Sequence, residues 1–260
     1  MQKNTVELGC GLIGIGRVWG VKESRVPSEQ EALTFLNAAL AQSIRFFDTA
    51  PSYGLSEERL GKWLKTLNKQ QRQGIIVATK FGEHWSNERQ QPFVSHEFDV
   101  LSASLNQSLL RLGKIDVLQL HKTNPTVLKN DGVKRALEYA KEKGIQQFGA
   151  SVSDVESGEM VCEDDRFTLI QLPFNQENTI FTPIIREATR KGKLVVTNRP
   201  FNMGAMVNKE GNKTKTLLEQ EAFQFILTQF FNGFILTGTK SPDHLRENIE
   251  AFDKAKDSIS

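Results

Sequence analysis

Residues 45–61 read RFFDTAPSYGLSEERLG and hold the features that decide the fold. A short apolar strand, Ile44–Phe47, ends on an acid, Asp48, and the tight turn that follows carries Tyr53. Ser56, a residue typical of helix N-caps, then begins a helix with acidic residues in its first turn. Asp48 and Tyr53 therefore lie where a strand passes into a helix, and ligands of parallel α/β proteins bind at that end of their strands.

The rest of the chain repeats this order of strand and helix. The expected strands are 8–15, 44–47, 75–79, 115–120, 146–150, 167–172, 194–197 and 234–237. The expected helices are 28–43, 56–68, 96–112, 126–143, 154–161, 183–191, 215–231 and 242–256, with loops at 81–95 and 199–214. Such strands pair in parallel through right-handed crossovers. Eight of them without a change in composition predict one (β/α)8 TIM barrel domain over residues 1–260.

Charge and cysteine content limit the classes of partner. The 260 residues include 33 Lys and Arg against 31 Asp and Glu, a formal net charge of +2 without a run of like charge. This balance gives no reason to expect nucleic acid or a membrane as partner. Cys10 and Cys162 lack metal-ligand spacing, so we expect free thiols and no metal site. Without a signal pattern or an apolar run near ~20 residues, a cytoplasmic monomer is the default expectation.

Four polar residues directly follow consecutive predicted strands and should converge on one mouth of the barrel. They are Asp48, Lys80, His121 and Ser151, and Tyr53 lies in the turn after the first. For any one of them a solvated loop position is a sufficient explanation, and for His121 alone it is the preferred one. Four successive strands that all end in reactive groups favour a shared site.

This set of side chains suits protonation of a carbonyl oxygen. A phenol with its ordinary pKa of about 10 is a weak acid at neutral pH. The ammonium group of Lys80 beside Tyr53 favours the phenolate and lowers that pKa, while Asp48 keeps the ammonium charged and in place. The His121 imidazole can hydrogen-bond a substrate carbonyl and direct it to the phenol. Because no side chain supplies hydride, a cofactor must do so.

These residues resemble the catalytic motifs of the aldo-keto reductases, and the resemblance covers nearly the whole chain. DTAPSYGLSEERLG at 48–61, the lysine of IIVATKFG and the histidine of IDVLQLHK match the family's catalytic tetrad in order and spacing. The resemblance implies reduction of an aldehyde or ketone to an alcohol, with NADPH as the expected cofactor and NADH as the alternative. Tyr53 is then the general acid, assisted by Lys80, Asp48 and His121. The chain's other tyrosine, Tyr139, lies within a predicted helix as a packing residue.

The resemblance also implies a cofactor site. Ser151 in FGASVSD and Gln171 in IQLPFN match family residues that contact the nicotinamide carboxamide. GTKSPDHLREN at 238–248 resembles the site for the adenosine end of NADP, at a helix N-terminus suited to anions. Its candidate residues are Thr239, Lys240, Ser241, His244 and Asn248. The segment is equally an ordinary helix start, since Ser241 and Pro242 form a good N-cap and N1 pair.

Two positions depart from the family pattern. His244 stands where many relatives place an arginine that grips the 2′-phosphate, which leaves the choice between NADPH and NADH open, although Lys240 and Arg246 could compensate. Asn198 and Arg199 stand where an aromatic ring often stacks on the nicotinamide. Phe201 could take the place of that ring, and Arg199 is a candidate partner for the pyrophosphate.

The substrate pocket is expected to include Trp19, His84 and Trp85, because tryptophan side chains at a barrel mouth can form an apolar wall. Either tryptophan could equally cover the barrel rim. The substrate itself, a small carbonyl compound, is not identified by these residues.

Two other functions fit the same residues. An NADP-binding sensor or regulatory protein with little turnover would keep the cofactor site, and the family includes channel β subunits that hold NADP in this way. A barrel isomerase or aldolase would instead use Lys80 as a Schiff-base nucleophile. Reduction ranks first because it uses the whole set of Asp48, Tyr53, Lys80 and His121.

Overall fold

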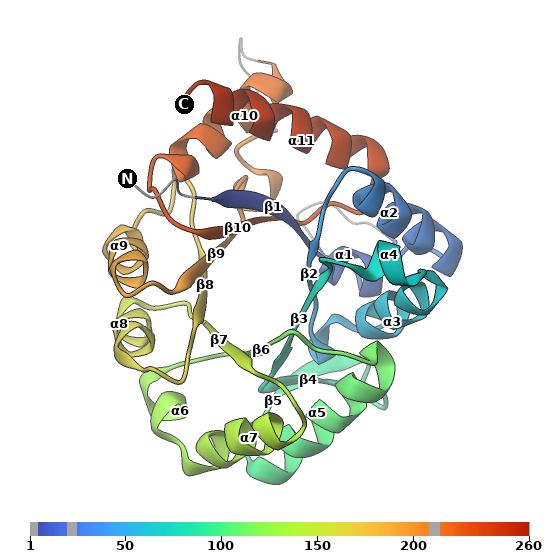
Figure 1. Cartoon of the computed structure of the whole chain (residues 1–260), viewed down its shortest axis with the longest axis vertical. Helices are drawn as coiled ribbons and strands as arrows, with labels where there is room; N and C mark the ends of the chain where they lie inside the picture. Colours follow the sequence, from blue (N-terminus) through green and yellow to red (C-terminus); the bar gives the residue numbers. More distant parts are fainter. Residues whose placement is uncertain (1–4, 20–24, 208–213, 260) are drawn as a thin grey trace.

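The computed structural model describes residues 5–19, 25–207 and 214–259, and it confirms the predicted barrel. Eight parallel strands close on themselves in the order β1-β10-β9-β8-β7-β6-β3-β2 (Figure 1). These barrel strands are β1 (Val6–Gly11), β2 (Phe46–Asp48), β3 (Ile76–Phe81), β6 (Val117–Leu120), β7 (Gln147–Ser151), β8 (Leu169–Pro173), β9 (Leu194–Asn198) and β10 (Gly233–Thr237). The predicted loop 199–214 lies partly outside the described residues.

Helices surround this barrel as an outer ring (Figure 1). They are α1 (Ile13–Gly16), α2 (Glu29–Ala41), α3 (Ser56–Thr66), α4 (Lys69–Arg72), α5 (Phe98–Leu112), α6 (Pro125–Lys129), α7 (Asp131–Glu142), α8 (Val155–Glu163), α9 (Thr182–Arg190), α10 (Lys215–Leu227) and α11 (Pro242–Asp257). Two short 3-10 helices, η1 (Pro51–Tyr53) and η2 (Asn202–Gly204), lie in loops after strands. None of the helices in the described ranges is both long and apolar enough to cross a bilayer. Both cysteines are buried free thiols, as expected.

The first predicted strand, 8–15, is too long. Strand β1 ends at Gly11, and the amide of Leu12 donates to the Asp48 carbonyl at 2.8 Å. The chain then turns into the short helix α1. Apolar content alone could not show this end, because a buried strand and a buried helical turn carry the same kind of residues.

The segment 81–95, predicted as a loop, contains an antiparallel hairpin of β4 (Glu83–Ser86) and β5 (Gln91–Val94). His84 lies opposite Phe93, with ring centroids 5.2 Å apart. Both strands contact η1, the turn that carries Tyr53. The hairpin therefore covers one side of that turn.

The helix predicted at 126–143 is two helices. The Asn130 side chain accepts hydrogen bonds from the amides of Gly132 and Val133. Asn130 thus caps α7 and separates it from α6, which has only 5 residues.

An apolar layer fills the inside of the barrel, and a polar layer lies on top of it. The apolar layer consists of Phe46, Ala78, Val117, Leu169, Val196, Phe234 and Leu236. Because side chains alternate along a strand, the residues two positions later also point inward, nearer the carboxyl ends. On β2, β3, β6, β8 and β9 these residues are Asp48, Lys80, Gln119, Gln171 and Asn198. The alternation of side chains along the strands therefore places these polar residues directly above the apolar layer, at the base of the candidate site.

Candidate active site

Asp48 and Lys80 form a buried ion pair in the polar layer. Lys80 Nζ lies 2.6 Å from Asp48 Oδ2 and donates to the Thr49 carbonyl at 2.9 Å. Burial on its own lowers the pKa of Lys80, but Asp48 and Tyr53 outweigh it and raise that pKa above its ordinary value. Lys80 is therefore a fixed positive charge at neutral pH.

Gln119 completes this arrangement and was missed in the sequence. Its Nε2 donates to Asp48 Oδ1 at 2.8 Å, so each carboxylate oxygen has its own donor. The residue lies inside β6 and not after it, where candidate residues were sought. A glutamine within an otherwise apolar strand was the available signal.

Tyr53 lies above the ion pair. Lys80 Nζ is 5.0 Å from the centroid of the Tyr53 ring, and the ring meets the His121 ring edge-on at 6.3 Å between centroids. Burial raises the pKa of Tyr53 above 10 and outweighs the lowering effect of Lys80. The expected effect of Lys80 has the right sign, but the expected net decrease is wrong, because burial is the larger cause. The phenol consequently keeps its proton at neutral pH.

His121 directly follows β6, as predicted, and presents a neutral imidazole. Its pKa is well below the ordinary 6.5 because the ring is buried and because Lys80, Lys122 and Arg17 are close. Its Nδ1 is 3.5 Å from Glu83 Oε2, too far for a good hydrogen bond, and lacks a hydrogen-bond partner within the described residues. The other ring nitrogen, Nε2, is not among the buried atoms and makes no hydrogen bond within the described residues, so the imidazole can hydrogen-bond an oxygen of a ligand through it.

The second half of the motif at 48–61 is structural. The predicted N-cap role of Ser56 is wrong, since α3 begins at this residue and Leu55 is its N-cap. The Ser56 hydroxyl is buried, donating to the Leu12 carbonyl at 3.0 Å and accepting from Thr49 Oγ1 at 2.8 Å. Local sequence cannot reveal this role, because the acceptor lies on a distant segment. Ser56 thus ties the start of α3 to the end of β1.

Glu57 and Gly61 fasten the same helix to its neighbours. Glu57 accepts from Thr79 Oγ1 at 2.7 Å and pairs with Arg111 Nη1 at 3.0 Å. A Cβ atom on Gly61 would lie 1.8 Å from the Arg111 carbonyl oxygen, so only glycine permits this approach of α3 to α5. The loop with Tyr53 is therefore held by a firmly packed helix.

The predicted nicotinamide residues lie on the next strands around the barrel. Ser151 on β7 is the register partner of Gln171 on β8. Gln171 is buried, and its Oε1 has no hydrogen-bond partner within the described part of the chain. Such an orphaned acceptor fits the NH₂ group of a carboxamide. Arg199, after β9, is exposed with φ of 57°, and its carbonyl accepts from Asn175 Nδ2 at 2.9 Å.

The predicted adenosine site surrounds the N-terminus of α11. Ser241 is the N-cap and accepts from the His244 amide at 3.3 Å, while Thr239 Oγ1 accepts from the Ser241 amide at 3.1 Å. Asn248 is buried one turn further along, and Lys240 Nζ donates to the Arg25 carbonyl. A groove of about 330 Å³ lies beside them, lined by Arg25, Pro27, Gln30, Glu31, Thr34, Lys240 and Pro242. Lys240, in the wall of this groove, therefore lies at the N-terminus of α11.

The predicted pocket residues Trp19 and Trp85 both lie close to Arg17, a residue that the sequence analysis missed. The Arg17 Cζ atom is 5.4 Å from the Trp19 ring centroid and 5.9 Å from that of Trp85. His84 is buried in the hairpin instead, with Nε2 3.0 Å from the Ser95 carbonyl. Of the three predicted pocket residues, the two tryptophans thus lie together near Arg17, whereas the His84 side chain bonds within its own hairpin segment.

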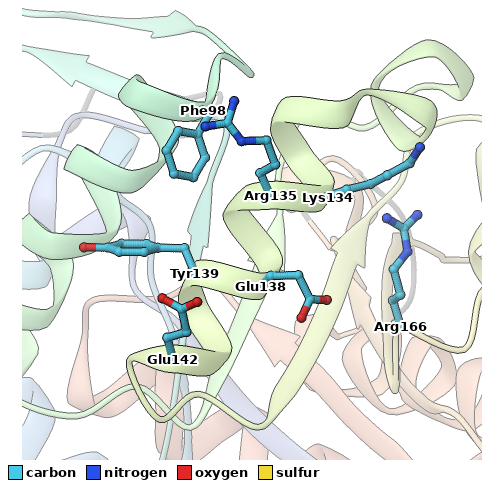
Figure 2. Close-up of a pocket in the computed structure, with 7 residues that line it drawn as sticks. All are labelled: Phe98, Lys134, Arg135, Glu138, Tyr139, Glu142 and Arg166. Carbon is cyan, nitrogen blue, oxygen red and sulfur yellow. The ribbon is translucent and has the colours of Figure 1, made fainter.

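A larger groove, of about 610 Å³, lies along α7, between Phe98 of α5 and Arg166 (Figure 2). It is lined by Phe98, Lys134, Arg135, Glu138, Tyr139, Glu142 and Arg166. The Tyr139 hydroxyl donates to Asn106 Oδ1 at 3.1 Å, and its ring packs edge-on against Phe98. Tyr139 is therefore a packing residue, as expected.

Known proteins share both the motifs and the barrel. The chain is 36% identical over 157 residues to the aldo-keto reductase str7 of Strobilurus tenacellus, which covers 58% of this chain and 43% of that protein. It is 28% identical over 273 residues to the uncharacterized oxidoreductase C215.11c of Schizosaccharomyces pombe, covering 96% of this chain and 85% of that protein. The chain thus spans less than half of the first relative and most of the second.

A solved structure agrees with this likeness over the whole barrel. The crystal structure of PA4992 from Pseudomonas aeruginosa, described as an aldo-keto reductase, superposes with a TM-score of 0.79 at 25% identity. The superposition covers 96% of this chain and 90% of that one. The model of the Aldo/keto reductase family matches residues 7–217. The chain belongs to the aldo/keto reductase family of oxidoreductases.

Proposed function

We propose that the protein reduces an aldehyde or ketone to an alcohol with a nicotinamide cofactor, NADPH in preference to NADH. One observation carries the proposal: the buried pair of Lys80 and Asp48 lies against Tyr53, which in turn contacts the neutral ring of His121. A protonated phenol, a fixed cation and a neutral imidazole at one mouth are suited to protonating a carbonyl oxygen. Family membership supports the same reaction.

Each residue has a separate part in this reaction. His121 holds the carbonyl oxygen of the substrate by a hydrogen bond, and the Tyr53 hydroxyl transfers its proton to that oxygen. Lys80 stabilises the phenolate that remains, and Asp48, held by Gln119, keeps Lys80 charged. The nicotinamide, when bound, supplies the hydride that the carbonyl carbon accepts.

The residues of the cofactor site fit such a group. Gln171 Oε1, an unpaired buried acceptor, would hold the carboxamide together with Ser151. Thr239, Ser241 and Lys240 would hold the adenosine phosphates at the N-terminus of α11, with His244 and Asn248 beside them. The preference for NADPH rests on Lys240, the lysine of the groove at this helix. Arg246 contributes less, because the carboxylate of Asp243 at 3.0 Å already balances its charge, whereas Lys240 donates to the uncharged Arg25 carbonyl.

Replacement of Tyr53 tests the proposal. With NADPH and a reactive aromatic aldehyde, the Tyr53→Phe variant should lose about a hundredfold or more of kcat, the usual contribution of a general acid. Tyr139→Phe, on α7, is the matched control and should keep the wild-type rate. A Tyr53→Phe variant with nearly wild-type kcat would refute the assignment of the acid.

Fluorescence titrations with NADPH and NADH measure the cofactor preference directly. Tight binding without turnover of any carbonyl compound in a broad panel would favour the regulatory alternative. Trapping of a substrate on Lys80 by borohydride would favour the aldolase alternative. Binding of neither nucleotide would contradict the reductase and the sensor together.

A further inference from the structure

The backbone at Arg17 lies directly beside η1, the turn that carries Tyr53. A Cβ atom on Gly16 would lie 1.9 Å from the Tyr53 carbonyl oxygen, so the two backbones are in contact. A Cβ atom on Gly54 would lie 3.5 Å from Arg17 Cβ, and the Leu55 amide donates to the Gly16 carbonyl at 3.1 Å. These contacts fix the start of the Arg17 side chain relative to Tyr53.

Three cations lie near His121, and two of them are neutralised. Lys80 pairs with Asp48 at 2.6 Å, and Lys122 pairs with Glu83 at 3.2 Å. Arg17 has no carboxylate partner within residues 5–19, 25–207 and 214–259, and its buried Nε has no hydrogen-bond acceptor there. The guanidinium is thus a positive charge at the site that this part of the protein leaves unpaired.

The surroundings of Arg17 hold its guanidinium in place. Trp19 and Trp85 approach it at 5.4 and 5.9 Å, and Trp85 belongs to β4, which contacts the turn with Tyr53. Indole rings stabilise a cation and shield it from water without using its N–H groups. A guanidinium held in this way retains its fork of donors, which matches the two oxygens of a carboxylate.

We propose that Arg17 binds a carboxylate group of the substrate, so that the preferred substrates are aldehydes or ketones that also carry a carboxylate. The inference rests on the proposed reduction, in which the carbonyl oxygen lies between Tyr53 and His121. Arg17 is a specificity-determining residue in this scheme and takes no part in proton or hydride transfer. Its charge fixes the far end of the substrate while the carbonyl is held at the phenol.

Matched pairs of substrates test the proposal. The kcat/KM values of 3- and 4-carboxybenzaldehyde are compared with those of 3- and 4-formylbenzamide, which have nearly the same shape and no charge. A charge-assisted hydrogen bond corresponds to about tenfold to a hundredfold in affinity. The wild-type ratio of acid to amide should therefore exceed about 10 for at least one ring position, and Arg17→Gln should lower that ratio by a similar factor, mainly through KM.

Two further variants sharpen the comparison. Arg17→Lys keeps the charge without the fork and should give an intermediate ratio. Arg190→Gln removes the same charge from an exposed ion pair with Glu187 on α9 and should keep the wild-type ratio. A wild-type ratio at or below 1 at both ring positions, or an unchanged ratio in Arg17→Gln, would overturn the proposal while leaving the reductase function in place.

A loss of all turnover would count against the reductase function itself, and binding then decides the role of Arg17. Titration with benzoate should quench the fluorescence of Trp19 and Trp85 in the wild type, because both rings lie close to the guanidinium. Saturable quenching that Arg17→Gln abolishes supports a carboxylate site. Equal quenching in both proteins overturns it.

Discussion

Replacement of either partner in the buried ion pair should cost more stability than replacement of both. Lys80 and Asp48 have side chains only 1% and 3% exposed, with Nζ and Oδ2 2.6 Å apart. Asp48→Asn leaves the ammonium without its counter-ion, and Lys80→Met leaves the carboxylate with Gln119 as its remaining donor. An uncompensated buried charge costs about 3–5 kcal/mol. At 2–4 °C per kcal/mol for a domain of this size, each single variant should melt about 6–20 °C lower.

The double variant Asp48→Asn, Lys80→Met contains no charge at this position. Its free energy of unfolding should fall by no more than that of either single variant, which gives a coupling of at least about 3 kcal/mol. Urea unfolding of the four proteins, with equal m-values as the check on two-state behaviour, measures this coupling. If the loss in free energy of unfolding of the double variant equals the sum of the two single losses, the two residues are not a coupled buried pair and the reasoning is refuted.

Two more results are expected. The pKa of Tyr53 is raised above 10 and that of His121 lies well below 6.5, so neither group titrates at neutral pH. The kcat/KM for carbonyl reduction should therefore stay level from about pH 7 to 9 and fall at higher pH, as the phenol loses its proton. A break near pH 6.5 that vanishes in His121→Gln would contradict the neutral imidazole. Gly61→Ala should lower the free energy of unfolding by about 1–3 kcal/mol or more, because its new Cβ meets the Arg111 carbonyl at 1.8 Å. Urea unfolding beside Gly238→Ala, where a Cβ meets nothing within 4 Å, measures that loss, and equal stabilities would contradict the close packing of α3 and α5.

Polar residues near the carboxyl ends of the barrel strands could be predicted because an apolar run meets a polar residue there, although Asp48, Lys80 and Ser151 lie within their strands and only His121 directly follows one. Asp48, Lys80 and His121 were found in this way, and the structure brings them together with Tyr53. Gln119 was missed because its inward direction follows from the alternation of side chains along β6. That alternation can be assigned only once Val117 is known to face inward. Local sequence marks the polar residues near a strand end more clearly than which face of the strand each residue occupies.

The parts that could not be predicted depend on contacts between distant segments. The hairpin β4–β5 has short strands with mixed composition, and its position depends on packing against η1. Arg17 gave no signal because the contact that distinguishes it, with Trp85, joins it to a distant segment of the chain. The balance of effects on Tyr53 was also hidden, because the extent of burial is a property of the folded protein.

The two-residue spacing between the apolar and polar layers limits how this sequence can change. Phe46 and Asp48 face inward together, whereas Phe47 between them packs outward against Trp63 of α3, with ring centroids 5.2 Å apart. An insertion or deletion of one residue within β2 would turn Asp48 toward the helices and bring a hydrophobic side chain to Lys80. The strands must therefore keep their length during evolution, while variation in length is left to the loops. Engineering of new specificity should accordingly begin with the segments around Arg17 and the hairpin.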